Sequence, residues 1–235
     1  MPSPTKKIVV SSELAYVLVN ILLSFAIAMV TTTDFGVSMV VAPAYILSLK
    51  VPFLTFGQAE YVIQGLLFLT LCLILKKIRL LYFFSFSTCL FYGALLDFWR
   101  TVIPVFNPDV FMPGSLSLPV RIVFFVIGTT LSTISIALVF RIYIYPQVYE
   151  FFVMGVSAKF GIETGKVKIV YDVVSLTLAV AMTLLFFGRF EGIGIGTVVS
   201  TAVNGQMIRF FGNWMDKHFE IKPSFPKFAE LFSYQ

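Results

Sequence analysis

Six long apolar runs restrict this chain of 235 residues to one kind of environment. The runs are near 14–33, 58–75, 80–100, 120–142, 167–187 and 192–213. Each is close to the length of about 20 residues that a helix needs to cross roughly 30 Å of hydrocarbon. Charged residues make up 12% of the chain, against roughly 25% in an average soluble domain. We therefore expect an all-α membrane protein, a polytopic bundle of about six transmembrane helices.

The order of the runs occurs twice along the chain. A long apolar run, a short stretch interrupted by Gly or Pro, and two further apolar runs are followed by the same series about 108 residues later. Because each series contains three spans, the second copy must be inverted in the bilayer. The pattern predicts an inverted 3+3 pseudo-repeat, which is the plan of many secondary transporters. Aligned pairs include Ser24 with Ser132, Gly57 with Gly165, Gln64 with Asp172 and, at an offset of 112, Gly93 with Gly205.

These elements divide the chain without a second domain. We expect a single membrane domain over 1–235, with one three-helix repeat at 10–103, a linker at 104–118, a second repeat at 119–216 and a cytoplasmic tail at 217–235. The linker is the part richest in Pro and Gly, which is typical of a loop.

The interrupted stretches, 35–48 and 145–158, are too short to cross a bilayer and too apolar for solvated loops. We expect two short broken or re-entrant helices there. Helix-breaking residues are tolerated at membrane depth where protein or a water-filled cavity satisfies the backbone, so these helices are candidates for gates or a binding site. Interfacial helices that pack on their own repeat are the alternative.

The basic residues predict the orientation. Thirteen of the 17 Lys and Arg residues fall on the side of the two termini, and four fall on the other side, namely Lys50, Arg100, Arg121 and Arg189. Basic residues accumulate on the cytoplasmic side of membrane proteins, so both termini are expected in the cytoplasm and the protein in the plasma membrane (the inner membrane of a bacterium). The basic residues are dispersed rather than gathered in a stripe, which argues against nucleic acid as a partner.

Polar residues inside the predicted spans are the candidate site. Asp172 is about one turn inside the fifth span, where a carboxylate costs at least about 2.5 kcal/mol unless it is neutral, paired or hydrated. Its repeat mate Gln64 is at the matching point of the second span, so both side chains can face one cavity. Protonation of Asp172 would then be able to couple to solute movement. A structural ion pair with Lys166 or Lys168 is the alternative.

Four further polar residues complete the predicted site: Asn20, Thr88, Ser200 and Asn204. Such side chains either contact a ligand or join helices by hydrogen bonds worth roughly 0.6 kcal/mol each. Gly192, Gly194 and Gly196 indicate close packing rather than a nucleotide loop, because the third glycine comes too soon for that motif. Aromatic residues near the span ends, among them Tyr145 and Tyr149, are typical of an interfacial belt.

No cofactor, metal or enzymatic activity is predicted. His218 is the single histidine and is placed beyond the last span, and Cys72 and Cys89 are both within spans. Neither a zinc site nor a histidine-based triad can be assembled from this set.

Glycine-rich motifs in the second half carry a family resemblance. The stretch from Gly155 to Gly165, the Gly-Ile-Gly-Ile-Gly-Thr start at 192–197 and the Asn204-Gly205 pair resemble the bacterial YczE/YyaS/YitT-like membrane protein family. The resemblance implies a multipass bacterial membrane protein. The biochemical function of that family is poorly defined, so the resemblance names no activity.

Together these features predict an integral membrane permease for a small molecule or ion, with a polar site at the repeat interface. A non-enzymatic accessory or scaffold protein, or the substrate-binding subunit of a vitamin uptake system with a separate ATPase, is the alternative. The expected partners are the lipid bilayer, an unknown small-molecule or ion substrate, and either a second copy or a partner membrane protein. A polar pocket at mid-depth favours the permease, whereas a dry, uniformly packed centre favours the scaffold.

The topology can be tested by labelling. Cysteines placed at Asn107 and at Ser224 are expected to react with a membrane-impermeant reagent from opposite sides of the membrane, because the basic residues place the linker and the tail on different sides. Labelling of both cysteines from one side would contradict the count of six spans and, with it, the inverted repeat.

Overall fold

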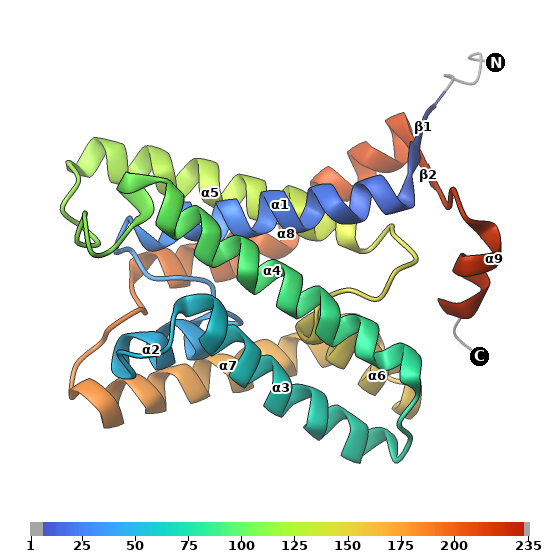
Figure 1. Ribbon diagram of the computed structural model, residues 1–235, viewed down its shortest axis with the longest axis horizontal. Helices are drawn as coiled ribbons and strands as arrows, with labels where there is room; N and C mark the ends of the chain where they lie inside the picture. Colours follow the sequence, from blue (N-terminus) through green and yellow to red (C-terminus); the bar gives the residue numbers. More distant parts are fainter. Residues whose placement is uncertain (1–6, 233–235) are drawn as a thin grey trace.

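The computed structural model describes residues 7–232 and is almost entirely helical (Figure 1). The first half contains α1 (Ser12–Thr31), α2 (Ala42–Lys50), α3 (Phe56–Leu75) and α4 (Phe83–Val102), and the second contains α5 (Leu118–Val139), α6 (Val148–Phe160), α7 (Thr164–Phe187) and α8 (Ile195–His218). Each half therefore has a long, a short and two further long helices in that order. The short helices α2 and α6 begin within the two interrupted stretches, where short helices were predicted.

Within the described residues, five helices are long and apolar enough to cross a membrane: α1, α3, α4 with the turn before it, α5 and α7. The protein is therefore a membrane-embedded helix bundle. The sixth predicted span corresponds to α8, which has 24 residues but is less apolar because Asn204, Gln206 and Arg209 interrupt it. The count of six spans stays a prediction.

The long helices pack as an open chain of neighbours. α8 contacts α5, α5 contacts α1 along much of its length, α1 contacts α4, and α4 contacts α3. α3 in turn packs against α2 and α6, and both short helices pack against α7. Figure 1 shows α1, α5 and α8 on one side of the bundle, α2, α3, α6 and α7 on the other, and α4 crossing between them. α7 and α8 are the two ends of this chain of contacts.

Local signals set the helix ends. Thr55 caps α3 with a capping box, in which its hydroxyl accepts from the Gln58 amide at 3.1 Å and the Gln58 side chain accepts from the Thr55 amide at 3.0 Å. Gly161 ends α6 and Gly188 ends α7 in the left-handed conformation, which glycine adopts without steric cost. Gly161 thereby separates α6 from α7, and Gly188 separates α7 from α8.

The non-helical stretch 32–41 runs inside the protein and closes one end of the bundle. The Val37 amide donates to the Gly192 carbonyl at 3.1 Å, and the Thr197 hydroxyl donates to the Val37 carbonyl at 2.7 Å. A Cβ at Gly194 would lie 2.6 Å from the Phe35 carbonyl oxygen. The close approach expected of these glycines is confirmed, although their neighbour is this stretch rather than another helix.

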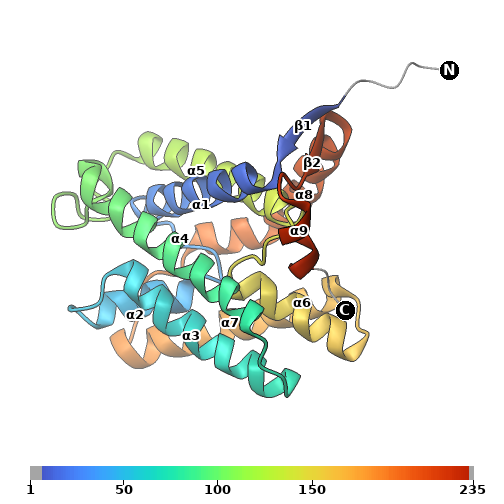
Figure 2. The same cartoon turned by 45° about the vertical axis from the view of Figure 1, so that its right-hand side comes forward.

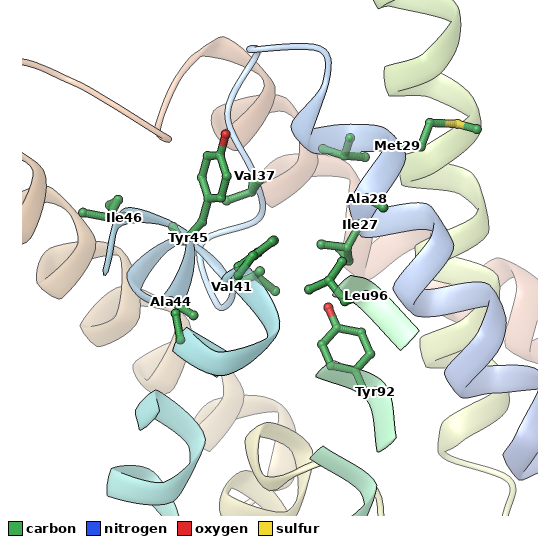
Figure 3. Close-up of a cluster of buried hydrophobic side chains, with 14 of the residues drawn as sticks. Ile27, Ala28, Met29, Val37, Val41, Ala44, Tyr45, Ile46, Tyr92 and Leu96 are labelled. Carbon is green, nitrogen blue, oxygen red and sulfur yellow. The ribbon is translucent and has the colours of Figure 1, made fainter. Parts of the chain in front are cut away.

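The main hydrophobic core surrounds the same stretch (Figure 3). Val37, Val41 and Tyr45 pack there with Ile27 from α1 and with Leu96 from α4. The short helix α2 is therefore buried in the protein rather than lying flat on an interface, because five of its nine residues, Ala42 to Ile46, are buried.

The two ends of the chain form a short parallel sheet that the sequence did not lead us to expect. β1 (Ile8–Ser11) pairs with β2 (Phe219–Lys222), with Ile8 opposite Phe219. The short helix α9 (Pro226–Ala229) follows β2, and the buried Phe232, in the 3-10 turn after α9, packs against Tyr145. The predicted tail is thus folded back onto the bundle.

Equivalent glycines in the two halves have opposite surroundings. In the first half, a Cβ at Gly57 of α3 would lie 2.2 Å from the Gly93 carbonyl oxygen of α4, so the two backbones touch. In the second half, Gly165 of α7 meets only the Glu163 side chain at 3.6 Å, and Gly205 of α8 meets nothing within 4 Å. α3 is therefore closed onto α4, whereas α7 stands away from α8.

This difference predicts opposite responses to the same substitution. Gly57→Ala is expected to destabilise the protein by about 1–3 kcal/mol, because its new methyl group meets fixed backbone. Gly165→Ala, at the same position of its helix, is expected to leave stability unchanged or raised, because the space is open and alanine favours helix. Thermal unfolding in detergent measures both, and equal losses would contradict the open gap between α7 and α8.

Candidate functional site

A cavity of about 800 Å³ occupies the gap between α7 and α8. α1 contributes Leu23 and Ile27 to its wall, and residues 38–41 close it at the end sealed by the non-helical stretch. Towards the other end the lining reaches Glu163 at the start of α7 and Arg209 in α8, on the side of the bundle where both chain ends lie (Figure 2). Its volume falls in the range of about 300–1,000 Å³ that is typical of small-molecule pockets.

Two of the predicted site residues line this cavity. Asp172 is on the α7 side, with a side chain 20% exposed, and it accepts a short hydrogen bond from Lys168. The ion pair that the sequence offered as an alternative is therefore present, and Asp172 faces the cavity as well. Asn204 is on the α8 side, and its buried Oδ1 accepts no hydrogen bond from any described residue.

Gln64 is fully buried next to the cavity, where it joins α3 to the start of α6. Its Oε1 accepts from the Val148 amide at 3.1 Å, and its Nε2 donates to Gln147 Oε1 at 3.2 Å and to Glu60 Oε2 at 3.0 Å. Helix starts leave backbone amides without partners, and Gln64 satisfies one of them. Gln147 itself lines the cavity, so Gln64 reaches the cavity through this neighbour.

The other three predicted residues do not line the cavity, and of these Thr88 alone bonds to other elements of the bundle. The Thr88 hydroxyl bonds to Tyr16 Oη at 2.9 Å and to the Tyr145 carbonyl at 3.2 Å. Ser200 donates to the Thr197 carbonyl within α8 at 3.1 Å, and Asn20 donates to the Tyr16 carbonyl within α1 at 2.9 Å. The Thr88 contacts match hydrogen bonding that holds helices together, whereas Ser200 and Asn20 satisfy their side chains on their own helix.

Glu60 is the functional candidate that the sequence analysis missed. It is completely buried in α3, one turn before Gln64, and its Oε2 accepts from Tyr149 Oη at 2.7 Å. A carboxylate at this depth costs roughly 2.5–3.5 kcal/mol unless it is neutral or compensated. The spacing of four residues places Glu60 and Gln64 on one helix face, a pattern that would have revealed the pair. Tyr149 was interpreted as part of an interfacial belt, and that was wrong, because it is buried inside the bundle.

Charges around the cavity are balanced. The acidic residues in its wall are Glu150, Glu163 and Asp172, and the basic residues are Lys166, Lys168 and Arg209. Lys166 and Glu163 are 3.8 Å apart. This mixture suits a polar solute without a large net charge, because neither sign dominates the wall.

The stretch that seals the cavity is held from outside by Arg121 of α5. Its Nε donates to the Thr33 carbonyl at 2.6 Å, its guanidinium lies 4.6 Å from the Phe35 ring centre, and its Nη2 lies 3.8 Å from Asp34 Oδ2. Burial raises the pKa of Asp34, and the Arg121 charge opposes this rise. The sealed end therefore carries a polar clamp on its outer surface.

The chain belongs to DUF6198, a family of unknown function, which matches residues 10–213. The match runs from the end of β1 through most of α8, and so it includes both halves and the whole cavity. No curated protein matches the chain. No solved structure matches it either.

The cavity can be tested by thiol labelling in a background that lacks Cys72 and Cys89. Gly205→Cys is expected to react with a membrane-impermeant reagent applied from the side of the termini, because Gly205 lines the cavity and has free space around it. Ser200→Cys on the same helix is expected to stay unlabelled, because Ser200 is buried. Equal labelling of the two cysteines would contradict the cavity.

Proposed function

We propose that this protein is a permease for a small polar solute, built as an inverted 3+3 repeat with both termini in the cytoplasm and its site at the repeat interface. The cavity between α7 and α8 is the observation that carries the proposal, since both halves line it. A scaffold protein would instead have a dry, packed centre. The resemblance to YczE-like bacterial proteins supports a multipass protein of the plasma membrane.

The contacts between helices support the repeat. Within each half, the first long helix packs on the last, as α1 does on α4 and α5 on α8. Between the halves, each short helix packs on the second long helix of the other half, as α2 does on α7 and α6 on α3. The main departure is that α3 is closed onto α4 while α7 is apart from α8. Two alternative packings of one element are what alternating access needs. The open gap in the second half therefore corresponds to the state that faces the cytoplasm.

A pair of charges at the mouth of the cavity has the position of a gate. In the closed first half, the Thr55 hydroxyl donates to Asp97 Oδ2 at 2.5 Å, and the Gly57 amide donates to Asp97 Oδ1 at 2.8 Å. The repeat places Glu163 at the position of Thr55 and Arg209 at that of Asp97. Both line the cavity, and no ion pair joins them among the described residues. Closure of α7 onto α8 would bring these opposite charges together.

The solute class follows from the wall of the cavity. Gln147 and Asn204 offer amide groups, Tyr92 and Tyr149 offer aromatic faces, and the charges cancel. Amides and aromatic rings recognise neutral polar molecules by hydrogen bonds and stacking. We infer a neutral or zwitterionic polar solute rather than a polyanion.

Transport can be tested by comparing uptake of an untargeted metabolite mixture into vesicles with and without the purified protein, in the absence of ATP. We expect at least one polar metabolite to accumulate only with the protein. In a Glu163→Cys/Arg209→Cys variant, oxidation is expected to stop this uptake and reduction to restore it, because a disulfide would hold the gate closed.

Each single-cysteine variant serves as the control and should be indifferent to the oxidant. Uptake that continues in the cross-linked variant would reject the gate. Identical metabolite contents in vesicles with and without the protein would reject the permease and favour an accessory or scaffold role.

A further inference from the structure

Glu60 is a buried acid with no charged partner. It has no exposed surface, and no ion pair to it occurs within residues 7–232. The repeat places Lys168 and Asp172 in α7 where α3 has Glu60 and Gln64. In α7 the acid and the base neutralise each other, whereas in α3 the acid is beside a neutral amide. Burial without a counter-charge strongly favours the neutral form of a carboxyl group.

The two carboxyl oxygens of Glu60 have different surroundings. Oε2 accepts from Tyr149 Oη at 2.7 Å and from Gln64 Nε2 at 3.0 Å, whereas Oε1 has no hydrogen-bond partner. Both donors can remain on Oε2 whether the group is ionised or carries a proton on Oε1. The carboxyl group can therefore hold one proton without losing either hydrogen bond.

A short path connects this carboxyl group to the cavity. Tyr149, which bonds directly to Glu60, lines the cavity, and so does Gln147, which bonds to Gln64. One hydrogen-bonded side chain therefore separates Glu60 from the cavity wall. The other titratable groups that face it from the surrounding elements are Cys89 and Tyr92 on α4, Glu150 on α6 and Tyr171 on α7. None of these groups is a base that would hold Glu60 ionised.

We propose that Glu60 is a proton-binding site that exchanges with the cavity, and that its protonation is coupled to the transport cycle. The proton passes between cavity water and Glu60 through the Tyr149 hydroxyl, which gives its own proton to the carboxylate and takes another from water, and release follows the reverse steps. The coupling rests on the proposed permease function, whereas the binding of the proton does not. Asp172, with Lys168 beside it, then belongs to the solute site instead of carrying the proton.

Infrared difference spectroscopy in lipid nanodiscs tests the proton site without knowledge of the solute. The wild-type protein is expected to show a carboxylic acid C=O band that disappears as pH rises and that shifts in D₂O, because Glu60 exchanges with cavity water. The band should be lost in Glu60→Gln and retained in Asp172→Asn. A band that persists in Glu60→Gln, or one that changes with neither pH nor D₂O, would overturn the proposal.

Two further arms separate the remaining outcomes. If Glu60→Gln does not fold, Tyr149→Phe is used instead, and the band should titrate at higher pH because the anion loses a donor; an unmoved midpoint would assign the band to another group. The spectra are also recorded with and without Na⁺ at fixed pH. If Na⁺ removes the band at fixed pH, the site binds a metal cation in place of the proton, and the proposal as stated is rejected.

Coupling is measured separately, in proteoliposomes with the metabolite that the uptake comparison identifies. A pH gradient is expected to drive its accumulation in the wild type and to have no effect in Glu60→Gln. Accumulation that still follows the gradient in Glu60→Gln would overturn coupling. Failure of uptake in the wild type would reject the permease, while the infrared result on the proton site would stand.

Discussion

Backbone groups inside a membrane protein must find partners within the protein, and the arrangement of the bundle follows from how the stretch 32–41 meets this demand. This stretch is not helical, so its amides and carbonyls bond to the start of α8 instead, through Val37 with Gly192 and Thr197. Glycines at that point let the two backbones touch. The start of α8 is thereby fixed at the sealed end, and the helix departs from there along α5, away from α7.

The cavity is the result of this geometry. α7 packs against the two short helices on the opposite side of the bundle and is not packed against α8. In the first half the corresponding helices, α3 and α4, are joined by the close approach of Gly57 to Gly93 and by the hydrogen bond from the Gly57 amide to Asp97. One set of elements therefore has both a closed and an open arrangement within one molecule. A difference of this kind between repeats is the basis on which we propose transport.

The network around Glu60 links this cavity to the interior of α3. Gln64 satisfies the start of α6, and Tyr149 from that same helix returns a hydrogen bond to Glu60. The buried acid is thus tied to the short helix that forms part of the cavity wall. A change of charge at Glu60 acts directly on α6, because a low local dielectric strengthens each of these bonds.

The long helices and the two short helices could be predicted from the sequence alone, because apolar length and the positions of Gly and Pro are local properties. It also indicated the close approach at Gly194 and the presence of Asp172 and Asn204 near a cavity. Three features depend on contacts between distant parts of the chain: Gln64 bonds to a neighbouring acid, Tyr149 is buried, and β1 pairs with β2. Glu60 and Tyr149 are 89 residues apart in the chain, and the pairing of Ile8 with Phe219 is more distant still. Such contacts depend on how helices far apart in sequence come together, which no local pattern records.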